Sequence, residues 1–530
     1  MADCTADTVE NMVSMMTDLT KTIEELNATI AALQTSIQSL KEDNALLLEE
    51  NKYLKRKLFG SKSEKISSTD PQQLSLFDEP ENKCKEELLE EITYSRNKKR
   101  FKGEKQLKLE DLEHVKELYD VEEKERVCDV CHSKMHRAGE EFVRSEVVYK
   151  PAKLYVKDIY RVSYQCRTCR KNNKVSIIKA GTPSPVIPHS YASSSAVTQI
   201  IIDKYVNHMP LYRQESQWKR LGLKLSRTTM ANWVIITSKE YFIPLVNRMH
   251  ELLIQEAYVH CDETTVQVLN EPGKEAISKS YMWVYSSIKE SEHPIKIFEY
   301  KPDRSAANPQ NFLKGFKGTT ITDGYHGYSN IDGVINAYCW AHVRRRFYDA
   351  LPSDLKDGTN TLAKEAVDKI AKLFVIEKEI NELSAGEKVK VRQEKSKPFI
   401  DDFFSWCQNN ENKVLTRSKL GKAISYALKY EKGLLVYLDD GYVPMTNSLD
   451  ERTIRPFTVG RKNWMFSVST KGANASAAAF SLIETAKANH LDPYDYIEYL
   501  LEIMPNIDFI KNPKRLDDFM PWSDQTQSIF

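Results

Sequence analysis

A heptad pattern near the N-terminus is the feature that most limits how this chain can fold. Two seam positions alternate without a break: Ile23, Ile30, Ile37, Asn44, Asn51 and Leu58 on the first, and Leu26, Leu33, Leu40, Leu47 and Leu54 on the second. β-Branched residues at the first position with leucine at the second favour two parallel helices, and buried asparagines fix their register. A helix packed on its own domain is the alternative, but it does not require so long a repeat. The pattern therefore predicts a leucine-zipper coiled coil and a homo-oligomer, most simply a dimer, formed through residues 23–58.

The length and charge of the chain limit its class without naming a function. A chain of 530 residues is too long for one hydrophobic core, so several domains are expected. The formal net charge is +1, so affinity for nucleic acid would have to come from local basic patches. No segment approaches the roughly eighteen apolar residues of a membrane helix, and the acidic N-terminus lacks the basic start of a secretion signal. We therefore expect a cytoplasmic protein with no membrane partner.

Two C-x-x-C pairs predict a metal site. The odd total of nine cysteines in a chain without a secretion signal argues against a disulfide framework. Each pair lets a tight turn present two thiolates, and two such turns close a tetrahedral zinc site. A redox role for one pair is the alternative, and the presence of the second pair argues against it. The pairs, Cys128 with Cys131 and Cys166 with Cys169, therefore predict a zinc ribbon with one structural zinc ion.

The next segment contains a candidate helix-turn-helix. One helix is expected from residue 211 to about 221, where Gly222 interrupts the pattern, and Ser226 is a natural N-cap for a second helix. The second helix would begin with short polar residues that can reach base edges in a major groove. An ordinary helical hairpin fits the pattern nearly as well, but the surrounding basic residues favour DNA. The expected DNA contacts are Arg213, Arg227, Thr228 and Thr229.

Strand-like runs then cluster around two acidic residues. The expected strands are 257–261, 281–288, 295–300, 319–322 and 334–338, with one helix at 308–313 and another from Trp340. Asp262 is expected to end the first strand, and Asp323 the fourth. In this mixed α/β order the first and fourth strands can lie side by side, which would bring the two acids together.

A third acid, Glu451, stands on a basic segment that we expect to be helical. An acid at a strand end is usually a solvated turn residue, and that interpretation is the better one for any of the three acids alone. Together they match a two-metal site, in which ions about 3.5–4 Å apart clamp the attacking and leaving oxygens of a phosphoryl transfer. Oxygen ligands favour magnesium or manganese. The residues expected to hold DNA phosphates near the acids are Arg452, Arg455, Arg461 and Lys462.

Several ordered blocks carry a resemblance to a known family. The blocks are HCDET from His260, TDGYHGY from Thr322, CWAH from Cys339, and ERTIRP from Glu451 with GRKNW after it. With the zipper and the cysteine pairs, they resemble the DDE transposases of the insertion-sequence sixty-six family over nearly the whole chain. The resemblance implies an RNase H-like catalytic core with Asp262, Asp323 and Glu451 as its acidic triad. The chain departs from the usual pattern at Thr446 and Ser448, where Asp and a second Asn are common.

The function that this resemblance implies is that of a DNA transposase, which cuts the ends of an insertion sequence and joins them to target DNA. The implied cofactors are two catalytic magnesium or manganese ions beside the structural zinc. The implied partners are the terminal repeats, the target DNA, further copies of the chain and helper proteins of the same element, at the bacterial nucleoid. Two alternatives stay open: a catalytically impaired DNA-binding relic, and a metal-dependent nuclease that does not join strands.

The expected fold is therefore multidomain: an N-terminal coiled coil, a zinc ribbon, a helical helix-turn-helix-like region, and an α/β RNase H-like core with an all-helical insertion. The expected boundaries are 1–59 for the coiled coil, 60–110 for a polar flexible linker, 111–182 for the ribbon, 183–250 for the helical DNA-binding region, 251–351 for the first part of the core, 352–436 for the insertion, 437–475 for the closing part of the core, and 476–530 for a helical tail.

Overall fold

The computed structural model describes residues 154–160, 163–165, 177–179, 181–352 and 361–530, with scattered positions between 20 and 41. The predicted linker and the four ribbon cysteines lie outside these residues. The described zipper positions are helical, and the seam residues among them are 50% to 57% exposed: Ile23, Leu26, Ile30, Leu33 and Ile37. A short antiparallel pair, β1 (Ser163–Gln165) with β2 (Ile177–Lys179), falls inside the range predicted for the ribbon. Among the helices described, none is long and apolar enough to cross a membrane.

The predicted helix, glycine turn and second helix are present. The helices of this region are α4 (Ser194–Tyr205), α5 (Leu211–Arg220), α6 (Arg227–Thr237), the π-helix η2 (Ser238–Phe242) and α7 (Ile243–Leu253). α5 ends before Gly222, whose φ of 99° is a value that glycine adopts at little cost. α6 starts at a cap in which Ser226 Oγ accepts a hydrogen bond from Thr229 N at 3.1 Å.

A mixed sheet follows. Its strands are β3 (Tyr258–Asn270), β4 (Lys279–Ser287), β5 (Lys296–Lys301), β6 (Thr319–Thr322), β7 (Ile335–Tyr338) and β8 (Ser467–Ser469). The order is β5-β4-β3-β6-β7, and β8 pairs with the far end of β3. β3, β4 and β5 are antiparallel neighbours, whereas β6 and β7 continue the sheet in parallel with β3. The predicted adjacency of the first and fourth strands is thus confirmed.

Asp262 does not end its strand, and that prediction was wrong. β3 continues to Asn270, because the Thr- and Val-rich residues after Asp262 suit a strand and pair with β4 as far as Gln267. The pairing of β3 with β6 stops at His260. Asp262 therefore lies just past the end of β6, where one edge of β3 loses its neighbouring strand.

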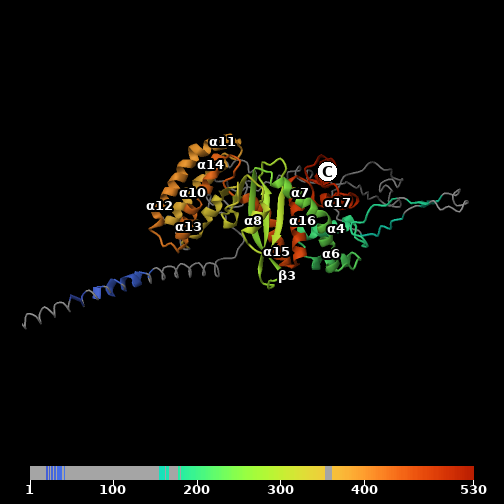
Figure 1. Cartoon of the computed structure of the whole chain (residues 1–530), viewed down its shortest axis with the longest axis horizontal. Helices are drawn as coiled ribbons and strands as arrows, with labels where there is room; N and C mark the ends of the chain where they lie inside the picture. The colour runs from blue at the N-terminus through green and yellow to red at the C-terminus, as the bar shows by residue number, and fades with distance from the viewer. Residues whose placement is uncertain are drawn as a thin grey trace, which may run out of the picture. The chain divides into compact units, whose positions relative to one another are not determined.

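The remaining helices fall into two groups around two hydrophobic cores. One core joins β3, β4 and β5 to α4–α7, to α15 (Ser448–Trp464) and to the tail helices α16 (Thr470–Ala488) and α17 (Pro493–Ile503). The other joins β6 and β7 to α9 (Trp340–Asp349) and to the helices of the predicted insertion. In Figure 1 the insertion helices lie together on one side of the sheet, and α4, α16 and α17 lie on the other.

The predicted insertion is helical where it is described. Its helices are α10 (Leu362–Glu379), α11 (Ala385–Val391), the π-helix η4 (Arg392–Ser396), α12 (Lys397–Glu411), α13 (Lys419–Lys429) and α14 (Glu431–Asp439). Its core includes Ile321 of β6 and Ala337 of β7, so these helices pack on the sheet and do not form a separate body. Shorter helices complete the fold: α8 (Ala307–Phe312), η3 (His326–Tyr328), η5 (Met504–Asn506), η6 (Pro513–Phe519) and α18 (Asp524–Gln527).

Candidate active site

α15 lies along the edge of β3 that no strand covers. β6 pairs with β3 only as far as His260, and β8 pairs with it again at Val268. Between these points, Asn447 Nδ2 donates a hydrogen bond to the carbonyl oxygen of Cys261 at 3.1 Å, and Arg461 Nη1 donates to that of Thr265. Side chains from the two ends of one helix therefore bind the open edge. This attachment brings the first turn of α15 to the site of Asp262.

Asn447 joins the start of α15 to two residues of β3, Cys261 and His260. It precedes α15 as the N-cap residue and is fully buried, yet its side chain does not cap the helix. Its Oδ1 lies 2.6 Å from His260 Nδ1, and burial lowers the pKa of His260 to about 4. The imidazole is therefore neutral near pH 7. Because Asn447 Nδ2 already donates to β3, its Oδ1 is the acceptor and His260 Nδ1 carries the proton. Neither residue was predicted as part of the site.

A buried carboxylate, Asp450, stands beside Asp262. Asp450 Oδ1 accepts a hydrogen bond from Ser286 Oγ at 2.8 Å, and its Oδ2 has no hydrogen-bond partner within the described chain. Burial raises the pKa of Asp450 to about 7. The pKa of Asp262 is raised well above its usual range by burial first, and then by the charges of Asp450, Glu263 and Asp323. Burial and mutual repulsion thus disfavour the charged forms of these neighbouring carboxyl groups.

Glu451 points from α15 towards α9. Its Oε1 lies 3.5 Å from His342 Nε2, and its Oε2 lies 3.8 Å from Arg345 Nη2. Burial lowers the pKa of His342 to about 4, so this contact is not an ion pair at neutral pH. Burial also raises the pKa of Glu451, with Arg345 opposing and Asp323 adding to the effect. The charge of Asp323 therefore acts on both other predicted triad acids.

The three predicted triad acids do not form a closed ligand set in this structure. Within the part of the chain that is described, no three His, Cys, Asp or Glu side chains are grouped so that they could hold one ion. The donors nevertheless suit a divalent cation. All three are carboxylates, which magnesium and manganese prefer. Glu451 Oε1 is buried without a hydrogen bond, and burial first, with neighbouring carboxylates adding to it, raises the pKa values of Asp262 and Glu451.

The predicted DNA contacts have different environments. Arg213, Arg227, Thr228, Arg455 and Lys462 are exposed, whereas Thr229 and Arg452 are half-buried. Thr229 also belongs to the cap of α6.

Arg461 differs from the other predicted contacts, because it is committed to β3. Besides the carbonyl of Thr265, its Nη1 contacts the hydroxyl oxygens of Thr264 at 3.1 Å and Thr265 at 3.2 Å. These contacts of Nη1 point to a role in fastening α15, and the phosphate contact at Arg461 stays a prediction.

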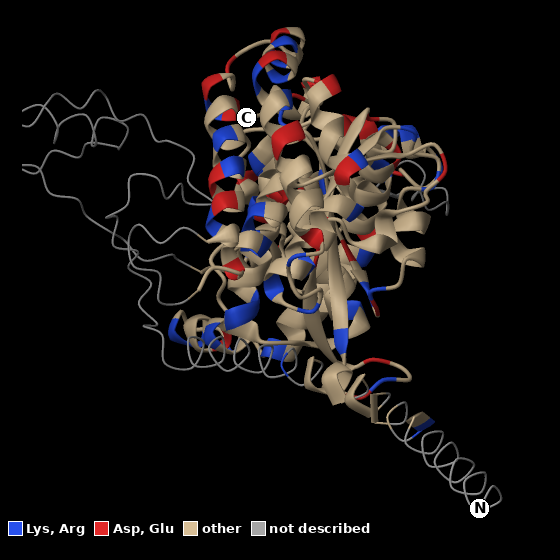
Figure 2. Cartoon of the chain, turned by 90° about the vertical axis from the view of Figure 1, so that its left-hand side faces the viewer, with Lys and Arg blue, Asp and Glu red and all other residues tan. Residues whose placement is uncertain are grey.

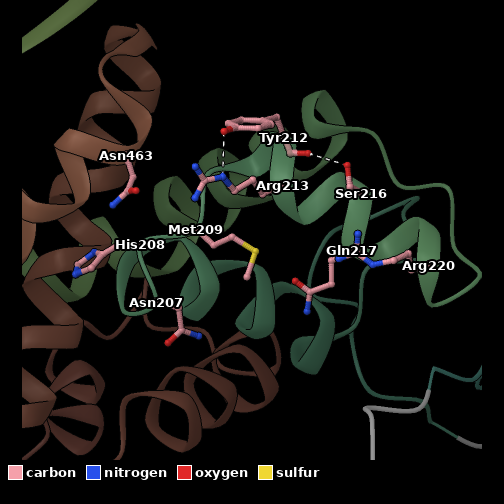
Figure 3. A pocket seen from close by; sticks show the side chains of 9 residues that line it. All are labelled: Asn207, His208, Met209, Tyr212, Arg213, Ser216, Gln217, Arg220 and Asn463. Atoms are coloured by element: carbon pink, nitrogen blue, oxygen red, sulfur yellow. Dashed lines mark hydrogen bonds between the residues drawn. The ribbon is translucent and has the colours of Figure 1, made fainter.

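A polar cavity separates α5 from the end of α15. Its volume is about 530 Å³. Arg213 Nε donates to Tyr212 Oη at 3.0 Å on one wall, and Asn463 of α15 stands on another, as Figure 3 shows. The lining contains no carboxylate; its residues are Asn207, His208, Met209, Tyr212, Arg213, Ser216, Gln217, Arg220 and Asn463. Guanidinium, amide and hydroxyl groups of this kind suit an anionic, hydrogen-bonding ligand such as a nucleotide of DNA.

Comparison with known proteins decides the family. The family model described as "Transposase IS66 family" matches residues 189–475, which is more than half of the chain. The chain belongs to this family. The IS66 C-terminal element matches residues 481–522, and the zinc-finger binding domain of transposase IS66 matches residues 125–170, a range that contains all four predicted zinc cysteines. A fourth model, "Transposase C of IS166 homeodomain", matches residues 46–116. The resemblance stated from the sequence is thus confirmed.

Relatives of this IS66 family member include proteins of Sinorhizobium fredii (strain NBRC 101917 / NGR234). Uncharacterized protein y4jD is 29% identical over 89% of this chain and 93% of its own length. Uncharacterized protein y4hP is 29% identical over 74% of this chain and 73% of its own. A solved structure, the Drosophila P element transposase strand transfer complex, covers 62% of this chain and 94% of its own at 12% identity, with a TM-score of 0.21. A TM-score this low supports no inference about a shared fold.

Proposed function

We propose that this IS66 family member is a DNA transposase whose carboxylates Asp262, Asp323 and Glu451 bind two magnesium or manganese ions in an RNase H-like core. One observation carries the proposal. The parallel pairing of β3 with β6 brings Asp323 towards Asp262, while α15 is fastened along the same open edge of β3 with Glu451 in its first turn. This arrangement supports a site near the end of β6 to which all three carboxylates, although remote in sequence, would contribute.

The three acids are positioned by different local contacts. Asp262 is carried by the central strand of the sheet. Asp323 follows β6 and accepts a hydrogen bond from Tyr325 N at 2.8 Å, which fixes its side chain within the turn. Glu451 is held near Arg345 and a neutral His342, so its position depends on α9 as well as α15. Bound divalent ions would activate the attacking oxygen and stabilise the leaving oxygen of the phosphoryl transfer.

We propose that the DNA runs from the helix-turn-helix along α15 to these acids. Exposed residues of the helix-turn-helix along this path are Arg213, Arg227 and Thr228. Near the end of α15, Lys462 is exposed as well. The helical rise puts Asn463 roughly 18 Å from Glu451 along α15. That span equals about five nucleotides of B-form DNA, so the cavity beside Asn463 would contact the strand about five nucleotides from the reacting phosphate. By contrast, the insertion helices that face the viewer in Figure 2 carry basic and acidic residues interspersed.

Two further parts of the proposal concern assembly. The exposed seam of Ile23, Leu26, Ile30, Leu33 and Ile37 supports a parallel dimer, since apolar residues at this spacing are normally covered by a partner helix. The zinc-finger match over the four cysteines supports one structural zinc ion in the ribbon. A dimer would allow two ends of an element to be held in one complex.

A strand-transfer assay with end-labelled terminal DNA and a plasmid target tests the proposal. Joined product in magnesium or manganese is the expected result. Cleavage without joining would identify the nuclease alternative, and specific binding without cleavage would identify the catalytically impaired relic.

A further inference from the structure

The predicted insertion touches the turn that carries Asp323. Tyr426 of α13 donates its hydroxyl hydrogen to the main-chain carbonyl oxygen of Asp323. Burial raises the pKa of Tyr426, so its hydroxyl stays protonated and available as a donor. The contact joins residues 103 positions apart in the chain. It is therefore a feature of the folded core, and not of the local turn sequence.

Gly324 makes this close approach possible. Its φ of 85° is a left-handed value that side chains disfavour. A Cβ atom at this position would lie 2.7 Å from Tyr426 Oη and 3.4 Å from Tyr426 Cζ. The turn after Asp323 thus needs glycine for two reasons: its left-handed backbone conformation and the close approach of Tyr426.

Tyr426 is itself held in place by neighbours on both sides. The guanidinium of Arg346 lies over its ring, with Cζ 3.9 Å from the ring centroid, and the ring of Tyr430 packs edge-on at 4.7 Å. Arg346 belongs to α9, where its neighbour Arg345 faces Glu451. The helix beside Glu451 therefore also braces the tyrosine that contacts Asp323.

The insertion is fastened firmly enough to transmit such a constraint. Trp340 Nε1 of α9 donates to the carbonyl oxygen of Leu434 in α14 at 2.9 Å, and both residues are buried. Gly433 packs so closely that an added Cβ would lie 2.2 Å from the ring of Tyr338 in β7. α14 is thus packed closely on β7, and Ile424 and Ala427 of α13 belong to the same hydrophobic core as Ile321 of β6 and Ala337 of β7.

We propose that Tyr426 is a positioning residue for Asp323, and that the helical insertion serves as the support of this second triad carboxylate. The expected effect on catalysis rests on the proposed function. The expected effect of Tyr426 on the Asp323 turn does not depend on it. Loss of the hydroxyl frees the Asp323 carbonyl and loosens the turn in which Gly324 N donates to Thr322 Oγ1 at 3.2 Å and Tyr325 N donates to Asp323 Oδ1 at 2.8 Å.

The test compares Tyr426→Phe with Tyr430→Phe in the full-length protein. Each change removes one hydroxyl from α13 or the residue just after it. The Tyr426 hydroxyl is hydrogen-bonded to the Asp323 carbonyl, whereas Tyr430 approaches Gly324 with the edge of its ring, which Tyr430→Phe keeps. In Tyr426→Phe we expect faster amide hydrogen exchange in a peptide covering residues 322–328. We also expect roughly tenfold slower cleavage and a several-fold higher manganese concentration for half-maximal binding. Tyr430→Phe should match the wild type in all three measurements, and both variants should bind end DNA normally in calcium.

Equal exchange of the 322–328 peptide in wild type and Tyr426→Phe, together with an unchanged manganese requirement, would overturn the inference. Equal effects of the two substitutions would overturn it as well, because the effect would then be one of general packing. If the wild type does not cleave in any metal, the proposed function fails, whereas the hydrogen-exchange comparison still decides whether Tyr426 holds the turn.

Discussion

Arg304 donates from Nε to Glu263 Oε1 at 2.7 Å, on the face of β3 opposite to Asp262. Tyr328 Oη donates to the other carboxylate oxygen at 2.8 Å, and the ring of Tyr325 lies under the guanidinium. Glu263 is therefore a buried structural acid, although it is adjacent in sequence to Asp262.

Replacing Glu263 should separate stability from catalysis. Glu263→Ala leaves Arg304 and Tyr328 without their acceptor, so it should lower the free energy of unfolding by about 1–3 kcal/mol. At saturating magnesium its cleavage rate should remain far above that of Asp262→Ala. Urea unfolding measures the stability of the two variants, and cleavage assays measure their rates. Glu263→Gln is the control that keeps the shape of the side chain. If Glu263→Ala were as inactive as Asp262→Ala while still folded, Glu263 would belong to the metal site.

Each triad acid should be essential for chemistry and dispensable for recognition. Asp262→Ala, Asp323→Ala and Glu451→Ala should each slow cleavage and joining by at least roughly a hundredfold, because an under-coordinated ion cannot hold its oxygen in line. Specific binding of terminal DNA should persist, and calcium should permit binding with little chemistry. Gel shifts and strand-transfer assays on the same preparations provide the two readouts. Near-normal joining by Glu451→Ala would make Asp450 the next candidate for the third acid.

The cavity beside Asn463 should contribute one phosphate contact. Arg220→Ala should weaken binding of terminal DNA and reduce the slope of log affinity against log salt by about one. Lys219→Ala is the matched control, since Lys219 is exposed on the same helix but does not line the cavity. Fluorescence anisotropy over a salt series measures both variants, and phosphate-ethylation interference locates the contact about five nucleotides from the cleaved bond. Equal changes in slope for the two variants would remove the cavity from the DNA path.

The ribbon should hold zinc through all four cysteines. Cys166→Ser should leave a three-thiolate site, lower the zinc content and loosen the ribbon, because a module of this size buries little core without its metal. The core from β3 onwards should stay folded. Elemental analysis and limited proteolysis report the two effects, and Cys84→Ser in the predicted linker controls for loss of a thiol outside the pairs. Full zinc occupancy in Cys166→Ser would contradict the ligand assignment.

Deleting residues 1–58 should reduce the assembly state. The exposed isoleucine and leucine seam would be lost, and with it the proposed dimer contact. Light scattering coupled to gel filtration gives the mass with and without the segment. An unchanged mass would mean that another surface joins the copies.

The sequence predicts more of the fold than of the hydrogen bonds that position the residues of the candidate site. The adjacency of β3 and β6 followed from strand order, and the helix of Glu451 from its pattern. Tyr426 and Asn447 could not be found in this way, because their partners lie 103 and 186 positions away and their bonds go to main-chain oxygens that every residue possesses. The contact of Arg461 with β3 was missed for a related reason: an arginine suits a DNA phosphate and a bare strand edge equally well, and the sequence does not separate the two uses.

The occupied edge of β3 also has a consequence for the solution behaviour of the protein. A strand edge with free carbonyl oxygens is a template on which another polypeptide can add a strand. Here the carbonyl of Thr265 is taken by Arg461 and that of Cys261 by Asn447, so the gap left between β6 and β8 offers no free acceptor at these two points. Arg461→Ala would reopen part of this edge, and its first visible effect should be self-association at high protein concentration.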